Sequence, residues 1–79
     1  MIMNIEVTYF GRLAEITHKH SEGIEGDFET AQDFIQTLWE LYPEMKHITL
    51  NIAQNNKIVQ KEQSLVNMNI DVFPPFSGG

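Results

Sequence analysis

The sequence predicts a single α+β domain that covers residues 1–79, and two patterns carry this prediction. One is a segment with helical periodicity at residues 31–42, and the other is an alternation of apolar and polar residues on both sides of it. The expected order is strand, short helix, weak strand, long helix and then three short strands. No internal repeat or linker divides the chain. We therefore expect one domain with one main helix.

The first strand is expected at residues 3–9, where every second residue is apolar. Its apolar face comprises Met3, Ile5, Val7 and Tyr9. A period of two is typical of a strand with one buried face. Gly11 interrupts this pattern, and Leu13 and Ile16 are then spaced i, i+3 within residues 12–17. This spacing predicts one or two helical turns.

Residues 18–29 are polar and contain Gly23 and Gly26, which favours a short edge strand with turns. The acidic side chains of this stretch are expected to face water; they are Glu22, Glu25, Asp27 and Glu29. His18 and His20 have no third ligand nearby in the sequence. We interpret both as residues of a solvated loop, and no metal site is predicted.

The main helix is expected at residues 31–42 because Thr30 and Asp33 have the spacing of a capping box. Its expected apolar face comprises Ala31, Phe34, Ile35, Leu38, Leu41 and Tyr42, with Trp39 at the edge. Pro43 should end the helix, because the residue before a proline is disfavoured in the α region. The aromatic residues of this face are interpreted as core.

Three short strands are expected after the helix. Residues 48–53 alternate, the pair Asn55-Asn56 favours a tight turn, and residues 57–59 form the returning strand. Leu65 is an isolated apolar anchor in a polar loop. The last strand contains Ile70, Val72 and Phe73, and it should end at the following prolines.

Composition excludes several classes of function. Cysteine is absent, so the chain has neither a disulfide nor a catalytic thiol. Eleven acidic residues against five basic ones give a net charge of −6, which disfavours nucleic acid and favours partners with basic surfaces. The start of the chain has no signal-peptide pattern, and no apolar run has membrane-spanning length. We expect a cytoplasmic protein without a membrane partner.

Catalytic arrangements are also missing from the sequence. No glycine-rich phosphate loop is present, and Ser64 and Ser77 have no histidine–carboxylate support. The domain is therefore not expected to be an enzyme alone or to bind a cofactor. Its remaining reactive group is the terminal carboxylate of Gly79.

The segment 74–79 is expected to be an extended tail. Pro74 and Pro75 favour a stiff, polyproline-like conformation. Gly78 and Gly79 have no Cβ, so they can pass through a channel too narrow for a side chain. An external enzyme that uses ATP could convert the carboxylate to an acyl-adenylate. A sulfur nucleophile would then give a thiocarboxylate, and an amine would give an amide.

Residues 70–79, Ile-Asp-Val-Phe-Pro-Pro-Phe-Ser-Gly-Gly, resemble the end of the small, sulfur-carrying subunits of molybdopterin synthase. Residues 7–17, Val-Thr-Tyr-Phe-Gly-Arg-Leu-Ala-Glu-Ile-Thr, are similar to that family's first strand and short helix. The chain departs from the family at Gln54-Asn55-Asn56, where Val-Asn-Gly is common, and at Met68-Asn69, where Gly-Asp is common. The resemblance implies a β-grasp, ubiquitin-like fold, with a mixed sheet of four to five strands on one main helix.

The resemblance also implies a function and partners. Gly79 would be adenylated by an activating enzyme with ATP and then thiocarboxylated with sulfur from a donor protein. The thiocarboxylate would give its sulfur to cyclic pyranopterin monophosphate inside the large synthase subunit, forming molybdopterin. In this account Phe76 anchors the tail, Pro74 and Pro75 limit the entropy lost on insertion, and Gly78 fits the tunnel. Ser77 belongs to the same partner-binding segment.

Three other interpretations stay open at the level of the sequence. The chain could carry sulfur for thiamin or for a sulfur amino acid, or it could modify proteins by joining Gly79 to lysines. It could also be a plain binding domain. The first two share the activation step with the molybdopterin interpretation, so they differ from it in the fate of the activated carboxylate.

Overall fold

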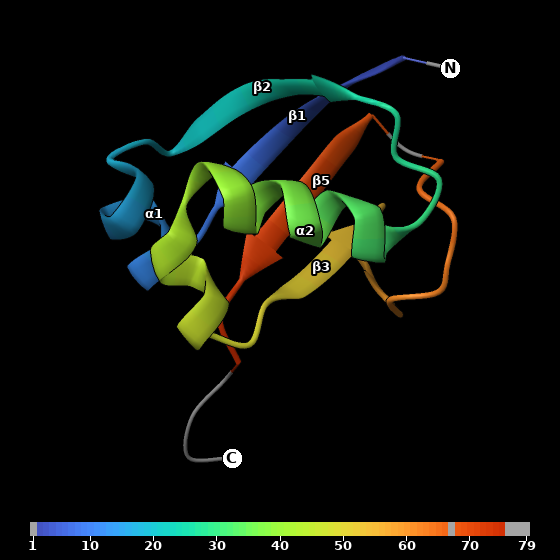
Figure 1. Cartoon of the computed structure of the whole chain (residues 1–79). Coiled ribbons are helices and arrows are strands. Elements are labelled where there is room, and N and C mark those ends of the chain that lie inside the picture. The colour runs from blue at the N-terminus through green and yellow to red at the C-terminus, as the bar shows by residue number, and fades with distance from the viewer. Residues whose placement is uncertain (1, 67, 76–79) are drawn as a thin grey trace.

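Five strands form one mixed sheet, and a single long helix crosses one of its faces (Figure 1). The fold is described from a computed structural model, which defines residues 2–66 and 68–75. The elements in chain order are β1 (Met3–Tyr9), α1 (Arg12–Thr17), β2 (Ser21–Gly26), α2 (Ala31–Leu41), the 3₁₀-helix η1 (Pro43–His47), β3 (Asn51–Gln54), β4 (Lys57–Val59) and β5 (Asn69–Phe73). This order confirms the predicted α+β class and adds η1, which the sequence pattern did not predict.

The strand order in the sheet is β2-β1-β5-β3-β4. The first and last strands, β1 and β5, pair in parallel, and every other neighbouring pair is antiparallel. The C-terminal strand thus lies in the middle of the sheet and is hydrogen-bonded on both sides. This topology is the expected β-grasp arrangement, and β2 lies at an edge as the sequence predicted.

The core lies between the sheet and α2. Alternate residues of β1 and β5 face the helix: Ile5, Val7, Ile70 and Val72 are fully buried. From the helix, Phe34 and Leu38 are fully buried against them, and Phe34 makes an edge-to-face contact with Phe28, with ring centroids 5.2 Å apart. Burial of such side chains from both layers supplies the main stabilising free energy of a small domain that lacks disulfides.

The start of α2 has the predicted capping box. The Thr30 hydroxyl accepts a hydrogen bond from the Asp33 backbone N–H, and the Asp33 carboxylate accepts one from the Thr30 backbone N–H. The predicted apolar face is wrong for Leu41, which is 52% exposed. The chain leaves the α-helix at Tyr42 and turns into η1, which places the fully buried Met45 in the core. Pro43 ends the helical periodicity, so Met45 belongs to no pattern that the sequence shows.

Strand β3 begins at Asn51, three residues later than predicted from the alternation at residues 48–53. The reason lies in its partner, since Asn51 pairs with Phe73, the last residue of β5. Beyond Phe73, the segment after β5 continues as Pro74 and Pro75, which have no backbone N–H to donate to strand pairing. The alternation itself is retained, because Leu50 and Ile52 are both buried and Ile48 packs against the core.

The turn between β3 and β4 confirms the prediction made from two consecutive asparagines. Asn55 and Asn56 have φ values of 54° and 64°. Left-handed conformations at both central residues are typical of a type I′ hairpin turn, which asparagine tolerates. Leu65 is buried as expected. Its loop is fixed to the start of α2, where the Ala31 and Gln32 N–H groups donate to the carbonyls of Gln63 and Lys61.

The prediction that all four acidic residues of the β2 region face water is wrong for Glu22. Its carboxylate accepts hydrogen bonds from the Tyr9 and Tyr42 hydroxyls, each at 2.6 Å, and from Lys19 Nζ at 3.0 Å. The register explains this, because Glu22 pairs with the buried Val7 and therefore faces the helix side of the sheet. Glu22 joins the edge strand to β1 and to the end of α2. His18 and His20 are exposed, as predicted.

The Glu22 cluster shifts the pKa values of its members. Burial alone would raise the pKa of Glu22, but hydrogen bonds from Tyr42, Tyr9 and Lys19 outweigh it and hold that pKa below its ordinary value. Burial, followed by the hydrogen bond and charge of Glu22, raises the pKa values of Tyr9 and Tyr42.

Among the residues that the structure describes, no helix is both long and apolar enough to cross a membrane.

Candidate functional site at the base of the tail

The tail begins where β5 ends, at the lower end of the central strand in Figure 1. Pro74 is half-buried and Pro75 is exposed. These two are the only predicted tail residues within the described parts of the chain. The predicted site residues Phe76, Ser77, Gly78 and Gly79 lie outside the described residues. Because β5 pairs with strands on both sides, the sheet holds the base of the tail firmly.

Gly11 lies beside the first proline of the tail. The chain leaves β1 at Phe10, whose N–H donates to the Val72 carbonyl at 3.1 Å. Gly11 then has φ 59° and ψ −133°, a conformation that residues with a Cβ rarely adopt. A Cβ at Gly11 would lie 3.5 Å from Cγ of Pro74, which is an ordinary contact. The backbone conformation, rather than the available space, therefore calls for glycine at this position.

A groove of about 640 Å³ opens beside the two prolines. Gly11 and Arg12 come from the start of α1, and His47, Ile48 and Thr49 come from the end of η1 and the segment after it. Pro74 and Pro75 complete the lining. The groove combines a guanidinium, an imidazole and apolar surface. Such a mixture suits contact with another protein better than enclosure of a small substrate.

A second feature lies on the face of the sheet opposite α2. On this face lie Phe10, Ile58 and Phe73, together with Ala53, whose side chain is buried. Ala53 pairs with Ile58, and Phe73 follows the buried Val72 and so faces outward. Phe10 is 47% exposed and Ile58 is 59% exposed. Phe10, whose N–H donates to the Val72 carbonyl, lies near the base of the tail, and its exposed ring is available for contact with another protein.

The described residues do not form a metal centre of recognised type. No group of three or more His, Cys, Asp or Glu side chains among them could hold a metal ion. The most strongly perturbed titratable cluster, at Glu22, connects secondary-structure elements and does not line the groove at the tail. The geometry therefore directs attention to the tail and to the surfaces around its base.

The sequence located the tail but missed the residues around its base. Arg12 and His47 lie 35 positions apart in the chain, and only the fold brings both beside Pro74 and Pro75. In the sequence Gly11 marks the end of a strand, whereas its position beside Pro74 depends on the parallel pairing of β1 with β5. A resemblance over residues 7–17 was the one sequence signal that pointed to this region.

Comparison with solved structures shows the same fold in other proteins. A Pyrococcus furiosus protein, provisionally named molybdopterin converting factor, subunit 1, has a TM-score of 0.83 and 23% identity, covering 94% of this chain and 99% of that one. SAMP1 from Haloferax volcanii has a TM-score of 0.78 and 20% identity, covering 96% of this chain and 99% of that one. The small archaeal modifier protein 1 of Methanosarcina acetivorans has a TM-score of 0.77 and 22% identity, covering 100% of this chain and 99% of that one.

These identities are low enough that the structural likeness establishes the fold alone. The family comparison reaches further, because residues 7–79 match the ThiS family. That match includes β1 from Val7 onward, α2, the central strand β5 and the whole tail. The chain therefore belongs to the ThiS family of ubiquitin-like sulfur carriers.

Proposed function

We propose that Gly79 is the functional residue of this carrier and that its carboxylate is activated and thiocarboxylated. The observation that carries the proposal is the position of Pro74 and Pro75, which continue directly from the central strand β5. A tail that starts from the most firmly paired strand can enter a partner's active site while the domain stays folded. Two prolines at its base reduce the conformational entropy that the tail loses on insertion.

The chemistry takes place in two steps. The Gly79 carboxylate attacks the α-phosphorus of ATP, which gives an acyl-adenylate and releases pyrophosphate. A hydrosulfide equivalent then attacks the acyl carbon, the bond to AMP breaks, and a thiocarboxylate forms. Carriers of the ThiS family act with E1-like activating enzymes. The domain itself supplies the substrate carboxylate and the docking surfaces, so we assign it no catalytic step of its own.

We propose molybdopterin synthesis as the pathway. The support comes from the tail sequence at residues 70–79, which resembles the small subunit of molybdopterin synthase, and from the fold shared with the Pyrococcus furiosus protein. In this pathway the large subunit binds the tail and the thiocarboxylate donates sulfur to cyclic pyranopterin monophosphate. Phe76 would bind a pocket of that subunit, Gly78 would occupy the narrow tunnel, and Ser77 would connect the two.

A second candidate function is protein modification, in which Gly79 forms an amide with a lysine of another protein. The shared fold with two proteins named small archaeal modifier protein 1 supports it. Both candidates need the same acyl-adenylate. They differ in the nucleophile that follows, which is sulfur in the first case and an amine in the second.

Mass spectrometry of the intact chain separates these outcomes. The chain is incubated with its activating enzyme, ATP and sulfide, and the product is compared with a reaction that lacks ATP. We expect the mass of one sulfur to replace that of one oxygen at Gly79. Lysine-linked conjugates without any thiocarboxylate would favour the modifier, and an unchanged mass would contradict both candidates.

A chain that ends at Gly78 tests the role of the last residue. We expect it to unfold at the same temperature as the full chain, because surface changes away from packed contacts alter stability by less than about 0.5 kcal/mol. Its dithiolene-forming activity with the large subunit and pterin substrate should be lost. Substantial activity of the truncated chain would contradict the assignment of Gly79.

A further inference from the structure

Strand β2 forms one edge of the sheet. It pairs with β1 on one side, and within the described parts of the chain no strand lies on its other side (Figure 1). In an antiparallel pair, residues that are hydrogen-bonded to the neighbouring strand alternate with residues whose backbone groups point away from it. An edge strand therefore presents N–H and carbonyl groups to its surroundings at every second residue.

The register shows which residues of β2 have outward-pointing backbone groups. The Glu6 N–H donates to the Met68 carbonyl at 2.8 Å, so Glu6 is bonded toward β5 and not toward Gly23, its partner in β2. Because the pattern alternates, every second residue of β2 counted from Gly23 is likewise not bonded to β1. The outward-pointing residues are therefore Ser21, Gly23 and Glu25, and all three are exposed.

Gly23 lies at the centre of this row, and the domain itself gives no reason for glycine there. Its φ is not positive, and a Cβ would make one ordinary contact, at 3.5 Å from Oδ1 of Asn4. Glycine inside a strand often marks a place where another backbone approaches closely. The edge of β2 is open to such an approach.

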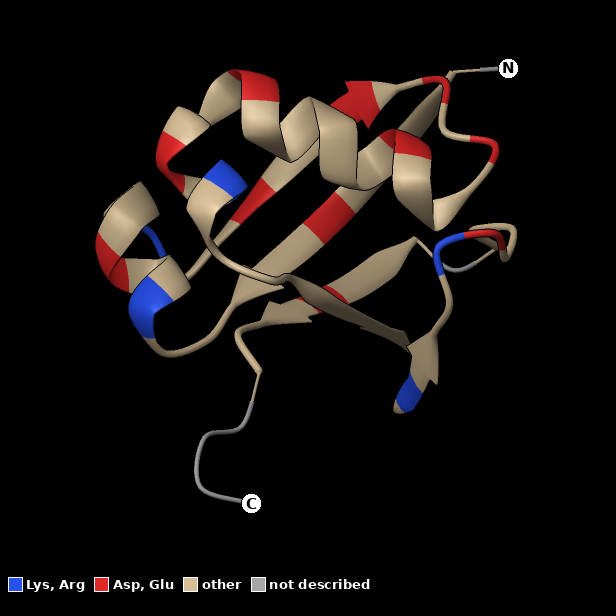
Figure 2. Ribbon diagram, turned by 60° about the horizontal axis from the view of Figure 1, so that its bottom comes forward, with Lys and Arg blue, Asp and Glu red and all other residues tan. Residues whose placement is uncertain are grey.

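The face of the sheet beside this edge is acidic. Glu25 on β2 and Glu6 on β1 are exposed on the face opposite α2, and neither forms an ion pair with another residue in the ranges 2–66 and 68–75. Lys19 lies close to β2, but its ammonium group is paired with Glu22 at 3.0 Å. Figure 2 shows further acidic residues along α2 and the sheet.

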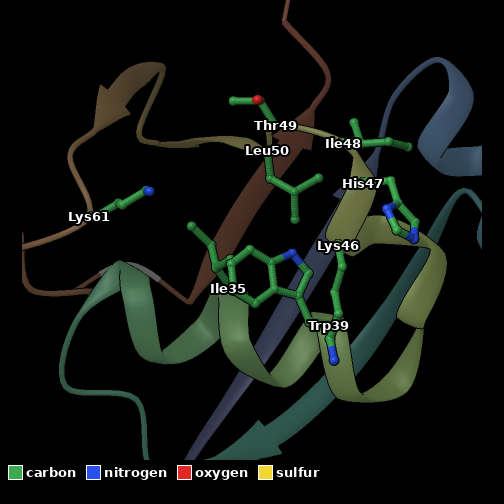
Figure 3. A pocket seen from close by; sticks show the side chains of 8 residues that line it. All are labelled: Ile35, Trp39, Lys46, His47, Ile48, Thr49, Leu50 and Lys61. Atoms are coloured by element: carbon green, nitrogen blue, oxygen red, sulfur yellow. The ribbon is translucent and has the colours of Figure 1, made fainter.

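The other basic side chains line different parts of the surface. Lys46 and Lys61 line a hollow of about 230 Å³ between α2 and the segment that follows η1, and none of the described residues around it belongs to β2 (Figure 3). Arg12 lines the groove beside the tail, and Lys57 lies on β4, at the opposite edge of the sheet. The β2 edge therefore keeps a local negative charge.

We propose that the edge of β2 binds an extended segment of a partner protein in which basic and apolar residues alternate. The segment adds a strand to the sheet, and its backbone pairs with Ser21, Gly23 and Glu25. Its side chains then point alternately to the two faces. On the face opposite α2, lysine or arginine side chains pair with Glu6 and Glu25. On the other face, apolar side chains lie beside Ile24, next to the core.

The charge at this edge favours a basic partner over a second copy of this chain. Two copies paired along β2 would bring the carboxylates of Glu6 and Glu25 from both copies to the same face, where like charges oppose pairing. The proposal is also independent of the sulfur-carrier function. None of the described residues that line the groove beside Pro74 and Pro75 comes from β2, so a partner held at this edge leaves that groove accessible.

Amide hydrogen exchange of the ¹⁵N-labelled full chain tests the pairing. The probe is a short peptide of alternating lysine and valine with both ends blocked. With the peptide, the amides of Ser21, Gly23 and Glu25 should exchange more slowly, whereas those of Glu22 and Ile24, which are bonded to β1, should change little. We expect saturable shifts with a dissociation constant on the order of 0.1 mM. A peptide with glutamate in place of lysine should not bind.

Gly23→Pro removes the central outward N–H without removing a bond to β1, and it should weaken binding at least tenfold. Ile58→Pro is the matched control. Ile58 has the corresponding outward position on β4, because the pair Gln54–Lys57 closes the hairpin turn, and this variant should bind as the unaltered chain does. Thermal unfolding checks that both variants fold. Glu6→Gln/Glu25→Gln changes no backbone group and should weaken binding at least fivefold.

Three results would overturn the proposal. The peptide could leave the three outward amides unprotected, or the glutamate peptide could bind as tightly as the lysine peptide. The same amides could also become protected without peptide as the concentration of the chain rises, which would make a second copy the occupant of the edge. If Gly23→Pro does not fold, unchanged binding by Glu6→Gln/Glu25→Gln would still refute the basic partner.

Discussion

Replacing Glu22 with alanine should destabilise the domain strongly, although the sequence pattern of this stretch predicts that its acidic side chains face water. The change removes the acceptor of two phenol hydrogen bonds, both 2.6 Å long. Tyr9 is only 2% exposed, so in the intact domain its hydroxyl depends on the carboxylate rather than on water. The same carboxylate holds together β1, β2 and the end of α2.

The magnitude follows from these contacts. A hydrogen bond to a charged group contributes about 1.5–3 kcal/mol, and the partial burial of the carboxylate offsets some of the gain from two such bonds. Lys19 is half exposed, so its ion pair with Glu22 is screened and adds little. We expect Glu22→Ala to lower the free energy of unfolding by about 2–3 kcal/mol. For a domain of this size the fall in Tm is roughly 10 °C or more.

Thermal unfolding followed by circular dichroism measures this effect, with Glu25→Ala as the control. Glu25 lies on the same strand but is exposed, and its pairing with Asn4 places it on the outer face of the sheet. The control should therefore change Tm little. Equal, small changes in both variants would refute the reasoning, because they would show that the two phenols do not depend on the carboxylate.

The same cluster predicts a dependence on pH. The folded pKa of Glu22 is lower than its ordinary value, so the ionised carboxylate stabilises the folded state. That contribution is complete above the pKa of an unfolded glutamate and is lost as pH falls through the lower folded value. The difference in Tm between the unaltered chain and Glu22→Gln should therefore be present at neutral pH and decrease in acid. A difference that stays constant into strong acid would assign the effect to packing.

Two further predictions concern the base of the tail and its partner. Gly11→Ala should lower the free energy of unfolding by roughly 1–3 kcal/mol, because Gly11 has a φ of 59°. Gly23→Ala is the control and should cost less, since Gly23 has no positive φ and a Cβ there would make an ordinary contact. Urea unfolding measures both changes. Comparable costs would contradict the conformational argument. Phe76→Ala should leave Tm unchanged yet weaken binding to a synthase large subunit at least tenfold, roughly 1.4 kcal/mol by titration calorimetry. Normal binding with early melting would instead make Phe76 a core residue.

The sequence predicted those parts of the fold that depend on local patterns. Alternation defined β1, the capping box at Thr30 defined the start of α2, and two asparagines defined the hairpin turn. These features depend on periodicity and backbone preference, which neighbouring residues in the chain determine. Pro74 similarly marks the end of β5.

The parts that the sequence missed depend on contacts between distant segments. Met45 enters the core from η1, between two charged neighbours, and no periodicity marks it. Glu22 becomes an acceptor only when the register of β2 against β1 turns it toward Tyr9 and Tyr42. In the same way, the tail is visible in the sequence, while Arg12 and His47 become its neighbours through tertiary structure.

The position of β5 between β1 and β3 has a consequence for how the domain responds to force. A partner that pulls on the tail applies a force along the axis of β5. The backbone hydrogen bonds that join β5 to β1 and to β3 are then loaded in shear, and they resist the force together. Hydrogen exchange should show the same stability of the central strand, with the amides of β5 exchanging only when the whole domain unfolds. In the proposed function, an enzyme would therefore bind, modify and release the end of the chain many times without loosening the sheet that presents it.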